Sequence, residues 1–416
     1  MRPLDLLYAL ALPFAALAWA ANGKHKTDWA ARFGKGDALP PAPDGRKTAL
    51  IHAVSVGEVN ATRTLAAELQ QLNFRVVVAA TTDTGMARAR QVYEPQGIAV
   101  IRNPFDFSFA VSRLLDRVKP DVFVAMELEV WPHMTMECLA RKIPFVVANG
   151  RLSERSFKGY LRARSLVSPM FVRITAALVQ NEAYAVRFRA LGARQVRVMD
   201  TMKWDTAVVE DASQVAGAAQ LAADLGIDRN LPLIVAGSTG PGEEELLIRT
   251  LPPGVQLLMA PRKPERFDEV AALCPHGTPR RSQNKPRAQG KDSPTAAPRV
   301  FLLDTLGELR KAYALADVAL VGRSFLGLHG SDPFEPVGLG KPTVIGPHHG
   351  DFKDAVDALA GAGGLCVCAD PMNEVARLLA DRPAGQAMAQ QGVAVIRSRQ
   401  GASRKYAAAI ASITGR

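Results

Sequence analysis

The chain has 416 residues, a formal net charge of +11 and a hydrophobic content of 48%. This length exceeds one typical domain and is sufficient for two hydrophobic cores. Aromatic residues make up only 6% of the chain and do not interleave with the basic ones, so stacking platforms for nucleic acid are not expected. The positive charge is therefore better suited to an anionic substrate or an anionic membrane surface.

The first segment in chain order is hydrophobic, since residues 4–21 contain a single charged side chain, that of Asp5. About 18 residues with a rise of about 1.5 Å each are just long enough to cross a thin bilayer. We therefore expect residues 1–22 to form a membrane-anchor helix, which either spans the bilayer or lies in its interface.

Basic residues follow this segment at Lys24, Lys26 and Arg32. The positive-inside rule then places the rest of the chain on the cytoplasmic side of the membrane. A cleaved signal peptide is the alternative interpretation, because Arg2 gives a short basic start and residues 18–20 resemble a cleavage site.

Strand and helix patterns alternate from Lys47 to Asp205. Buried apolar runs predict strands, at residues 48–54, 75–80, 99–101, 122–125, 145–148, 177–179 and 196–198. Amphipathic stretches predict helices, at residues 58–72, 85–93, 109–118 and 182–191. Such repetition implies a parallel sheet with helices on both faces, and we expect a first Rossmann-like domain over residues 47–205.

A polar helix is predicted over residues 210–225, and a second series of the same kind follows it. Its predicted strands lie at residues 233–238, 255–259, 300–303, 318–321, 343–345 and 365–368. We expect a second Rossmann-like domain over residues 206–395 and a C-terminal helix over residues 396–416. The fold class is therefore α/β, with two doubly wound domains that face each other across a cleft.

Two further features are compositional. Residues 278–299 are rich in Pro, Ser, Gln and basic residues, including Arg280 and Arg281, and are predicted to form a flexible surface loop. Contact of these cations with acidic lipid is a second interpretation. The four cysteines, at positions 138, 274, 366 and 368, lack paired C-x-x-C spacing and are too few for a disulfide framework. They indicate a reducing compartment.

In the first domain, acidic residues follow two of the predicted strands. Glu58 begins a helix after the strand at 48–54, where a carboxylate can accept a proton, although acidic residues also favour helix starts for dipole reasons. Glu127 and Glu129 follow the strand at 122–125, and two carboxylates there exceed what a turn requires.

In the second domain, the loop 237–242 follows a strand and opens a helix that begins with three glutamates. Its glycines, hydroxyls and amides can hold phosphate, whereas the glutamates either favour the helix dipole or repel an anion. Arg262 follows the next strand and is expected to face a charged ligand. The glycine-rich turn at 322–331, followed by the acidic segment 332–336, predicts a nucleotide pocket and suggests a nucleotide-sugar transferase.

A set of motifs occurs in the order found in one family. They are Ser55–Glu58, Glu127–Pro132, Asn149–Ser156, Gln180–Glu182, Lys203–Asp205, Gly237–Glu245, Pro261–Phe267, Asp304–Leu309 and Asp332–Pro336. With the hydrophobic N-terminus, they span about residues 1 to 400. In these respects the chain resembles 3-deoxy-D-manno-octulosonic acid (Kdo) transferases of the GT-B type.

The resemblance implies transfer of Kdo from CMP-Kdo to the glucosamine disaccharide of a lipid A precursor (lipid IVA), in lipopolysaccharide biosynthesis. It also implies the cytoplasmic face of a Gram-negative inner membrane, with no cofactor and no metal, and no Asp-x-Asp pair is present to hold a divalent cation. Direct displacement at the sugar would invert the anomeric configuration.

Site residues follow from the resemblance by position. Glu58 matches the family's proton acceptor, and Glu127 and Lys203 match residues that stabilise the transition state. The nucleotide-binding stretches correspond to Ser238, Pro261, Arg262, Leu306, Gly307, Glu308, Asp332, Pro333, Phe334 and Glu335. A carboxylate such as Glu335 can accept hydrogen bonds from ribose hydroxyls.

The chain departs from the family pattern mainly on the donor side. Gly240 and Lys263 stand where the family usually has His, Arg323 where it has Gly, and Ser331-Asp332 where it has His-Asn. An added carboxylate weakens binding of an anionic donor unless a cation such as Arg323 pairs with it, so these positions bear on the identity of the sugar.

Two alternatives remain at this point. One is a GT-B transferase or sugar-nucleotide epimerase with a different donor sugar, which shares the fold and part of the nucleotide pocket. The other is a non-catalytic, membrane-anchored protein that binds acidic lipid through its cationic surface, and the presence of the residues matched to the catalytic positions argues against it.

Overall fold

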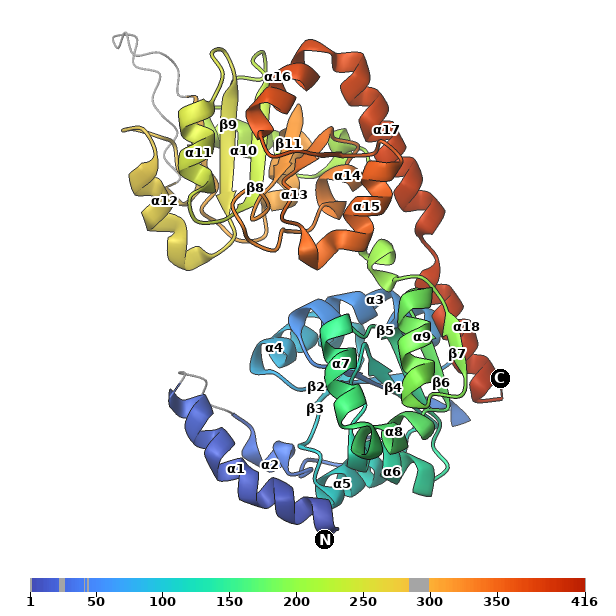
Figure 1. The fold of residues 1–416 in the computed structure, drawn as a ribbon. Helices are drawn as coiled ribbons and strands as arrows, with labels where there is room; N and C mark the ends of the chain where they lie inside the picture. The colour runs from blue at the N-terminus through green and yellow to red at the C-terminus, as the bar shows by residue number, and fades with distance from the viewer. Residues whose placement is uncertain (1, 22–26, 41, 43–44, 284–298, 416) are drawn as a thin grey trace. The chain divides into compact units, whose positions relative to one another are not determined.

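The computed structural model describes residues 2–21, 27–40, 42, 45–283 and 299–415 (Figure 1). The chain divides into two compact units, of which the first comprises Met1–Thr206 with Gln400–Arg416 and the second comprises Ala207–Arg399. Each unit is built around one parallel sheet with helices beside it. The prediction of two doubly wound α/β domains is thus confirmed.

The sheet of the first unit contains, among the described residues, seven strands in the order β3-β2-β1-β4-β5-β6-β7. They are β1 (Thr48–Ala53), β2 (Arg75–Ala80), β3 (Ala99–Arg102), β4 (Val122–Met126), β5 (Phe145–Gly150), β6 (Ala176–Val179) and β7 (Val196–Val198). The strand order reverses between the neighbours β1 and β4. In open parallel sheets, such a reversal opens a ligand-binding crevice at the carboxyl ends of the two strands.

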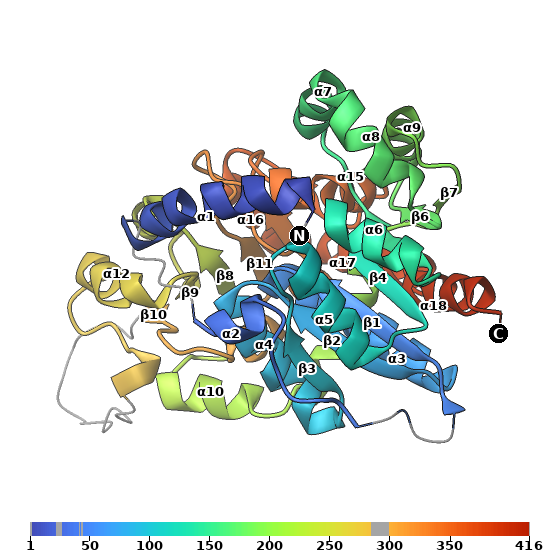
Figure 2. The same cartoon turned by 90° about the horizontal axis from the view of Figure 1, so that it is seen from below.

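Helices cover both faces of this sheet (Figure 2). One face is covered by α3 (Val56–Gln71), α4 (Asp83–Tyr93) and α18 (Ala402–Ile413). The other face is covered by α5 (Ser108–Val118), α6 (Pro132–Ala140), α8 (Arg164–Val172) and α9 (Glu182–Leu191). The unit also contains α1 (Pro3–Ala21), α2 (Trp29–Arg32), α7 (Glu154–Arg162) and the short 3-10 turns η2 (Glu94–Gln96) and η3 (Met202–Thr206).

The second unit repeats this topology with six strands in its described part, in the order β10-β9-β8-β11-β12-β13. They are β8 (Leu233–Thr239), β9 (Gln256–Pro261), β10 (Val300–Leu302), β11 (Val318–Val321), β12 (Thr343–Ile345) and β13 (Cys366–Val367). Its α-helices are α10 (Ala218–Leu225), α11 (Glu243–Thr250), α12 (Phe267–Leu273), α13 (Leu309–Leu315), α14 (Phe334–Gly338), α15 (Lys353–Gly361), α16 (Pro371–Ala380) and α17 (Arg382–Arg399). Its 3-10 turns are η4 (Ala212–Gln214), η5 (Pro264–Arg266), η6 (Arg281–Gln283) and η7 (Gly350–Phe352).

The continuous helix predicted over residues 210–225 is wrong. A 3-10 turn at 212–214 is followed by Gly217, whose φ of +80° interrupts the helical path before α10 begins. A left-handed residue at this point costs little only for glycine.

The C-terminal residues return to the first unit. Gly401 has a φ of +95° and separates α17 from α18. Asp205 accepts hydrogen bonds from the amides of Gly401 (2.6 Å) and Ser403 (2.5 Å), and so caps α18. Because Tyr406 and Ile410 are fully buried in the first core, α18 completes that unit.

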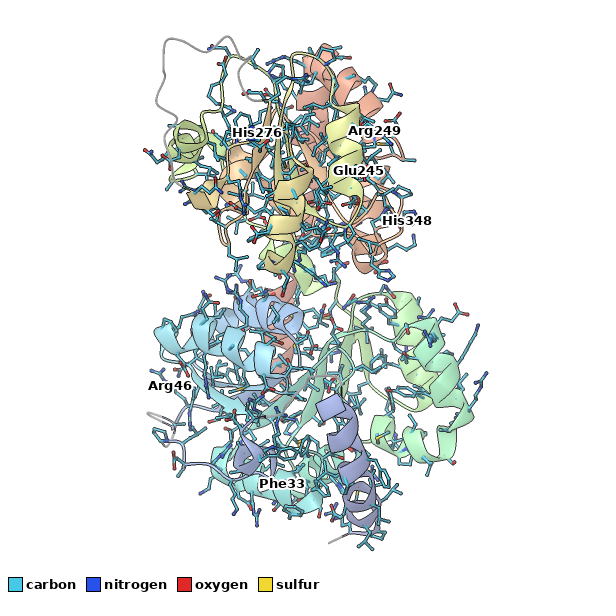
Figure 3. The ribbon with its side chains drawn as sticks, turned by 90° about the vertical axis from the view of Figure 1, so that its left-hand side faces the viewer. Phe33, Arg46, Glu245, Arg249, His276 and His348 are labelled. Atoms are coloured by element: carbon cyan, nitrogen blue, oxygen red, sulfur yellow. The ribbon has the colours of Figure 1, made fainter. Side chains whose placement is uncertain are left out.

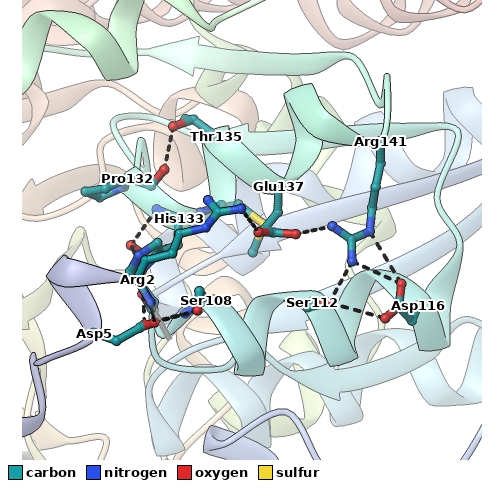
Figure 4. Close-up of polar contacts among 12 residues, drawn as sticks. Arg2, Asp5, Ser108, Ser112, Asp116, Pro132, His133, Thr135, Glu137 and Arg141 are labelled. Atoms are coloured by element: carbon teal, nitrogen blue, oxygen red, sulfur yellow. Dashed lines mark hydrogen bonds and ion pairs between the residues drawn. The ribbon is translucent and has the colours of Figure 1, made fainter.

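The start of α1 is fastened to the first unit by a polar network (Figure 4). The fully buried carboxylate of Asp5 accepts hydrogen bonds from the amide (2.7 Å) and hydroxyl (2.5 Å) of Ser108 at the beginning of α5. Arg2 pairs with Glu137 at 2.5 Å. Asp106 in turn accepts the amides of His133 and Met134 at the beginning of α6, each at 2.9 Å.

The spanning form of the expected N-terminal anchor is not supported. Within the described ranges, no helix combines the length and the apolar character needed to cross a bilayer. The Asp5 carboxylate is bonded to Ser108 at the start of α5. Arg32 is not a free cation either, since its buried guanidinium pairs with Asp83 at 2.9 Å, while Lys24 and Lys26 lie outside the described residues.

The predicted loop at 278–299 is ordered at its beginning. Arg280 pairs with Asp268 and Asp304, each at 2.8 Å, and Arg281 pairs with Asp224 and Glu308. Interpreting these two arginines as free surface cations is therefore wrong. Residues 284–298, which make up most of the predicted loop, lie outside the described residues.

Candidate active site

Several of the sequence-predicted residues lie at the strand-order reversals of the two sheets, whereas Lys203 follows the edge strand β7 and Leu306 to Glu308 follow the edge strand β10. In the first unit, Glu58 lies just after β1 and Glu127 just after β4, and these strands are hydrogen-bonded neighbours. In the second unit, Ser238 lies near the end of β8, while the segment 322–335 follows β11, its neighbour. Each set therefore lies at the edge where parallel α/β sheets bind ligands.

Glu58 is held by the first turn of α3. The Ser55 hydroxyl donates to Glu58 Oε1 (2.9 Å) and accepts from the Glu58 amide (3.4 Å), while the Val54 amide donates to Oε2 (2.9 Å). A Ser-x-x-Glu pair that bonds reciprocally is a capping box, which fixes the start of a helix. Glu58 thus has the structural role that the sequence left open, and that role also fixes the direction of its carboxylate.

The same carboxylate has an unusual proton affinity. The pKa of Glu58 is raised from 4.5 to about 7, chiefly by burial and also by the negative charges of Glu127 and Glu129, against the lowering effect of the Val54 amide and Ser55 hydroxyl. Desolvation and like charges both disfavour the ionised form of a carboxyl group. A carboxyl group with a pKa near neutrality is suited to accept a proton at physiological pH.

Glu127 and Glu129 follow β4 in a strained turn. Glu127 has a φ of +52°, its amide bonds to the Ala148 carbonyl (2.9 Å), and its carbonyl accepts from the Arg151 amide (3.3 Å). Non-glycine residues adopt this conformation rarely, and often at functional sites. Glu129 accepts a hydrogen bond from Trp131 Nε1 (2.7 Å), and burial raises its pKa.

Lys203 lies in the short turn η3, between two buried side chains. Met202 and Trp204 are buried to 98% or more and anchor the turn. Asn149, which is fully buried at the end of β5, accepts hydrogen bonds at its Oδ1 from the Met202 amide (3.1 Å) and the Thr201 hydroxyl (3.3 Å). Sequence reasoning did not assign Asn149 this supporting role, because the contact joins residues that are far apart in the chain.

The loop after β8 is organised by two buried glutamates of α11. Glu243 is fully buried and accepts four amides, from Gly240 (2.9 Å), Arg323 (2.6 Å), Ser324 (2.8 Å) and Phe325 (2.9 Å). Its carboxylate therefore ties the loop after β8 to the loop after β11. Because the Gly240 amide is occupied by Glu243, the prediction that the amides of this loop are free for phosphate is wrong at that position.

The other two glutamates of this run have different environments. Glu244 is fully buried and accepts from Arg266 (2.8 and 3.1 Å) and from the Thr239 hydroxyl (2.7 Å). Glu245 is exposed and lies on the outer surface of α11, as does Arg249 (Figure 3). Two of the three glutamates are thus engaged inside the fold, Glu243 by backbone amides and Glu244 by the cation of Arg266.

The stretches expected to hold the nucleotide have contrasting exposure. Pro261 is buried at the end of β9, and Arg262 after it is exposed, with its amide bonded to the Thr239 carbonyl (3.1 Å). Leu306 is 73% exposed. The pKa of Glu308 is lowered to about 2 by hydrogen bonds from Arg281, which has the largest effect, and from Thr305 and Lys311. This carboxylate therefore remains ionised and paired.

The segment 332–335 begins α14. Asp332 is exposed and accepts the Phe334 amide at Oδ1 (2.8 Å), whereas Pro333 and Phe334 are buried. Burial raises the pKa of Glu335, and the charge of Asp332 raises it further. Ser331 donates a long hydrogen bond of 3.4 Å to the carbonyl of Ser238, which has a φ of +55°.

Arg323 and Asp332 do not form the compensating ion pair that was suggested from the sequence. Among the described residues, no ion pair joins them. Arg323 instead lies beside Gly240, where an added Cβ would be 2.5 Å from Leu328 Cδ1 and 3.1 Å from Arg323 Cγ. The two departures at 240 and 323 are therefore coupled by packing.

Across the part of the chain that the structure describes, no group of three or more His, Cys, Asp or Glu side chains is arranged to hold a metal ion.

Comparisons with known proteins extend over nearly the whole chain. A family model described as 3-Deoxy-D-manno-octulosonic-acid transferase (kdotransferase) matches residues 27–206. A relative, the 3-deoxy-D-manno-octulosonic acid transferase of Bordetella pertussis, is 31% identical over 427 residues, which cover 96% of this chain and 97% of the relative.

Two solved structures are similar in fold over most of the chain. A glycosyltransferase from Rickettsia africae ESF-5 gives a TM-score of 0.61 at 11% identity, covering 89% of this chain and 99% of its own. A UDP-GlcNAc 2-epimerase from Neisseria meningitidis gives a TM-score of 0.57 at 15% identity, covering 88% of this chain and 100% of its own. At these identities the likeness shows the fold, which is of the GT-B type, and not the reaction.

Proposed function

The chain belongs to the 3-deoxy-D-manno-octulosonic acid (Kdo) transferase family, and we propose that it moves Kdo from CMP-Kdo to the glucosamine disaccharide of a lipid A precursor (lipid IVA). It is a glycosyltransferase of lipopolysaccharide biosynthesis. The observation that carries this proposal is the Glu58 carboxyl group, which lies at the strand-order reversal of the first sheet with its pKa raised to about 7.

In the proposed reaction, Glu58 is the proton acceptor. A sugar hydroxyl that attacks the anomeric carbon of Kdo must lose its proton, and a positioned base contributes about 10² to 10⁴ in rate. The bonds from Ser55 and Val54 hold the Glu58 carboxylate in place without lowering its pKa to the usual range. Attack on the face opposite CMP inverts the anomeric configuration.

Glu127 and Lys203 are proposed to stabilise the transition state. The rigid supports around them favour this role, since the left-handed backbone fixes Glu127 and the buried Met202 and Trp204 fix the turn of Lys203. Groups that are oriented before reaction stabilise developing charge without a reorganisation cost.

The donor is proposed to bind at the reversal of the second sheet. Ser238, Arg262 and the residues after β10 and β11 supply hydroxyl, cationic and carboxylate groups around that edge. Glu335, whose raised pKa reflects partial burial, accepts hydrogen bonds from ribose hydroxyls, and the leaving CMP gathers charge that Arg262 offsets. This assignment needs no cofactor and no metal.

The first experiment is direct transfer. Purified protein is incubated with a tetra-acylated lipid A precursor and a panel of nucleotide sugars that includes CMP-Kdo, and product masses are recorded. A mass gain of one or more Kdo units supports the proposal. Reaction with another donor but not with CMP-Kdo contradicts it, and so does inertness with every donor in the panel.

We also propose that α1 lies in the membrane interface at the cytoplasmic face of the inner membrane. Leu6, Leu7, Leu10 and Phe14 on α1 are each more than 55% exposed, although their side chains are large and apolar. A helix fastened to the protein at its start, with such a surface outward, is suited to contact lipid without spanning it.

Binding to vesicles tests this membrane contact. Leu10→Asp is expected to weaken binding to phosphatidylglycerol vesicles, measured by sedimentation, by about tenfold or more. The change removes apolar area that would be buried in the lipid, and it adds a negative charge next to an anionic surface. Leu166→Asp is the matched control, since Leu166 is 78% exposed on α8. Unchanged binding of Leu10→Asp would contradict the interfacial role of α1.

A further inference from the structure

The second sheet brings two loops into backbone contact at its strand-order reversal. β8 and β11 are neighbours, and the Gly322 amide donates to the Gly237 carbonyl at 2.8 Å. A Cβ added to Gly322 would lie 2.6 Å from Thr239 Cα, so the two chain segments touch. Ligands of doubly wound folds bind outside the carboxyl ends of such a strand pair.

Arg323 occupies this point in a conformation that arginine rarely adopts. Its φ is +59°, in the left-handed region, which costs a non-glycine residue roughly 1–3 kcal/mol. Its amide donates to Glu243 (2.6 Å), and its carbonyl accepts from the Gly330 amide (2.8 Å). The backbone is thus fixed on both sides, and this fixes the direction of the Cα–Cβ bond of Arg323.

The Arg323 side chain runs along the loop after β8. A Cβ at Gly240 would approach Leu328 Cδ1 to 2.5 Å and Arg323 Cγ to 3.1 Å, so the missing side chain at 240 leaves space that Leu328 and Arg323 share. Within the described ranges the Arg323 guanidinium has no hydrogen bond and no ion pair, and the residue is only partly exposed. By contrast, Arg266, Arg280 and Arg281 in the same unit are all paired with carboxylates.

We propose that Arg323 is a specificity-determining residue that binds the anionic part of the donor. That part is either the nucleotide phosphate or the carboxylate of the transferred sugar, and a guanidinium recognises both through paired N–H donors. The inference rests on the proposed function and deepens it. The strained, clamped backbone of Arg323 prepares the cation before the donor arrives, which lowers the entropic cost of binding.

The test compares binding of CMP with turnover of CMP-Kdo in three full-length variants. Arg323→Gln removes the charge. Arg323→Gly also removes it but relieves the left-handed backbone, so this variant is expected to melt at the wild-type temperature or above, which separates a binding effect from misfolding. Arg249→Gln is the matched control, since Arg249 is exposed on α11 of the same unit.

Loss of a charge-assisted hydrogen bond pair is expected to weaken binding about ten- to a hundredfold. If Arg323 binds the phosphate, titration with CMP shows this loss in both Arg323 variants, while competition by cytidine is unchanged. If it binds the sugar carboxylate, CMP affinity is retained and KM for CMP-Kdo rises by the same factor. Either result supports the inference and identifies the anion.

Unchanged CMP affinity together with unchanged KM for CMP-Kdo in Arg323→Gln would overturn the inference and leave the proposed function intact. The same holds if Arg249→Gln shows an equal loss, because the effect would then be general to cations of this unit. Absence of Kdo transfer by the wild-type protein would reject the proposed function instead, and the CMP titration would still report on the Arg323 contact.

Discussion

Both units place a glutamate in the first turn of the helix that follows the first strand of the sheet, but the two carboxylates have different environments. In the first unit, Glu58 receives one amide and one hydroxyl, and burial and neighbouring carboxylates raise its pKa to about 7. In the second unit, Glu243 is fully buried and receives four amides.

The comparison indicates that the topology places a glutamate at each of the two sites. The number of hydrogen-bond donors around the carboxylate then determines what that glutamate can do. Few donors leave a carboxyl group able to take up a proton near neutral pH, whereas four amides bind a carboxylate firmly and make it a structural clamp. Glu58 is therefore suited to the proposed role of proton acceptor, whereas Glu243 joins the loop after β8 to the loop after β11.

The largest expected effect is that of replacing Glu58 on turnover. Glu58→Gln should lower kcat by about 10² to 10⁴, because the proton acceptor is lost while the hydrogen bonds to Ser55 and Val54 can persist in part. Turnover of CMP-Kdo measures the change. Glu68→Gln, in the last part of the same helix α3, is the control and should keep wild-type turnover. Near-normal turnover of Glu58→Gln would show that Glu58 is not the proton acceptor.

The next largest effect is that of replacing Glu243 on stability. Glu243→Ala should lower the free energy of unfolding by about 3 kcal/mol or more, since four buried amides lose their acceptor. Thermal and denaturant unfolding measure the loss. Glu245→Ala, at the exposed position two residues on, should cost less than about 1 kcal/mol. Equal stability of the two variants would show that Glu243 is not a clamp.

The pH dependence of turnover tests whether Glu58 is the group that accepts the proton. Because Glu58 must be ionised to accept a proton, kcat should fall about tenfold for each pH unit below about 7. A pH–rate profile of the wild-type protein measures this limb. A profile that stays level down to pH 5 would assign proton transfer to another group.

The pH dependence of stability should have opposite signs at two carboxyl groups. The folded-state pKa of Glu58 is raised above 4.5, so its contribution to stability is present below about pH 4.5 and is lost as pH rises through about 7. The pKa of Glu308 is lowered to about 2, so its contribution is present above about pH 4.5 and is lost as pH falls through about 2. Melting temperatures of Glu58→Gln and Glu308→Gln across this range, each relative to wild type, should diverge in opposite directions.

The smallest expected effect concerns a third carboxylate, that of Asp5. Asp5→Ala should cost about 1–2 kcal/mol, because the amide and hydroxyl of Ser108 at the start of α5 lose their acceptor. Hydrogen exchange in α1 and α5 should rise, while turnover on a detergent-solubilised acceptor should stay near wild type. Unchanged exchange in both helices would show that Asp5 does not fasten α1.

Much of the fold could be predicted from the sequence, since apolar runs such as Arg75–Ala80 and Val318–Val321 are bounded by turn residues and coincide with strands β2 and β11. The prediction failed where a local pattern was continuous but the backbone was not, as at Gly217. At the N-terminus the apolar content was compatible with a spanning or an interfacial helix, and the sequence did not reveal that Asp5 has a partner 103 residues away.

The sequence by itself determined the α/β class, the repetition of two domains and the family, because these depend on periodicity and on motif order along the chain. Only the tertiary structure decided which acidic residues are buried and by what they are bound. Glu58, Glu243 and Glu308 all lie near strand ends, but Glu58 is bonded within its own helix turn, Glu243 takes three of its four amides from the loop after β11, and Glu308 pairs with Arg281. Burial and hydrogen bonding, which set the free energy of a charge, are properties of the folded neighbourhood and not of the residue type.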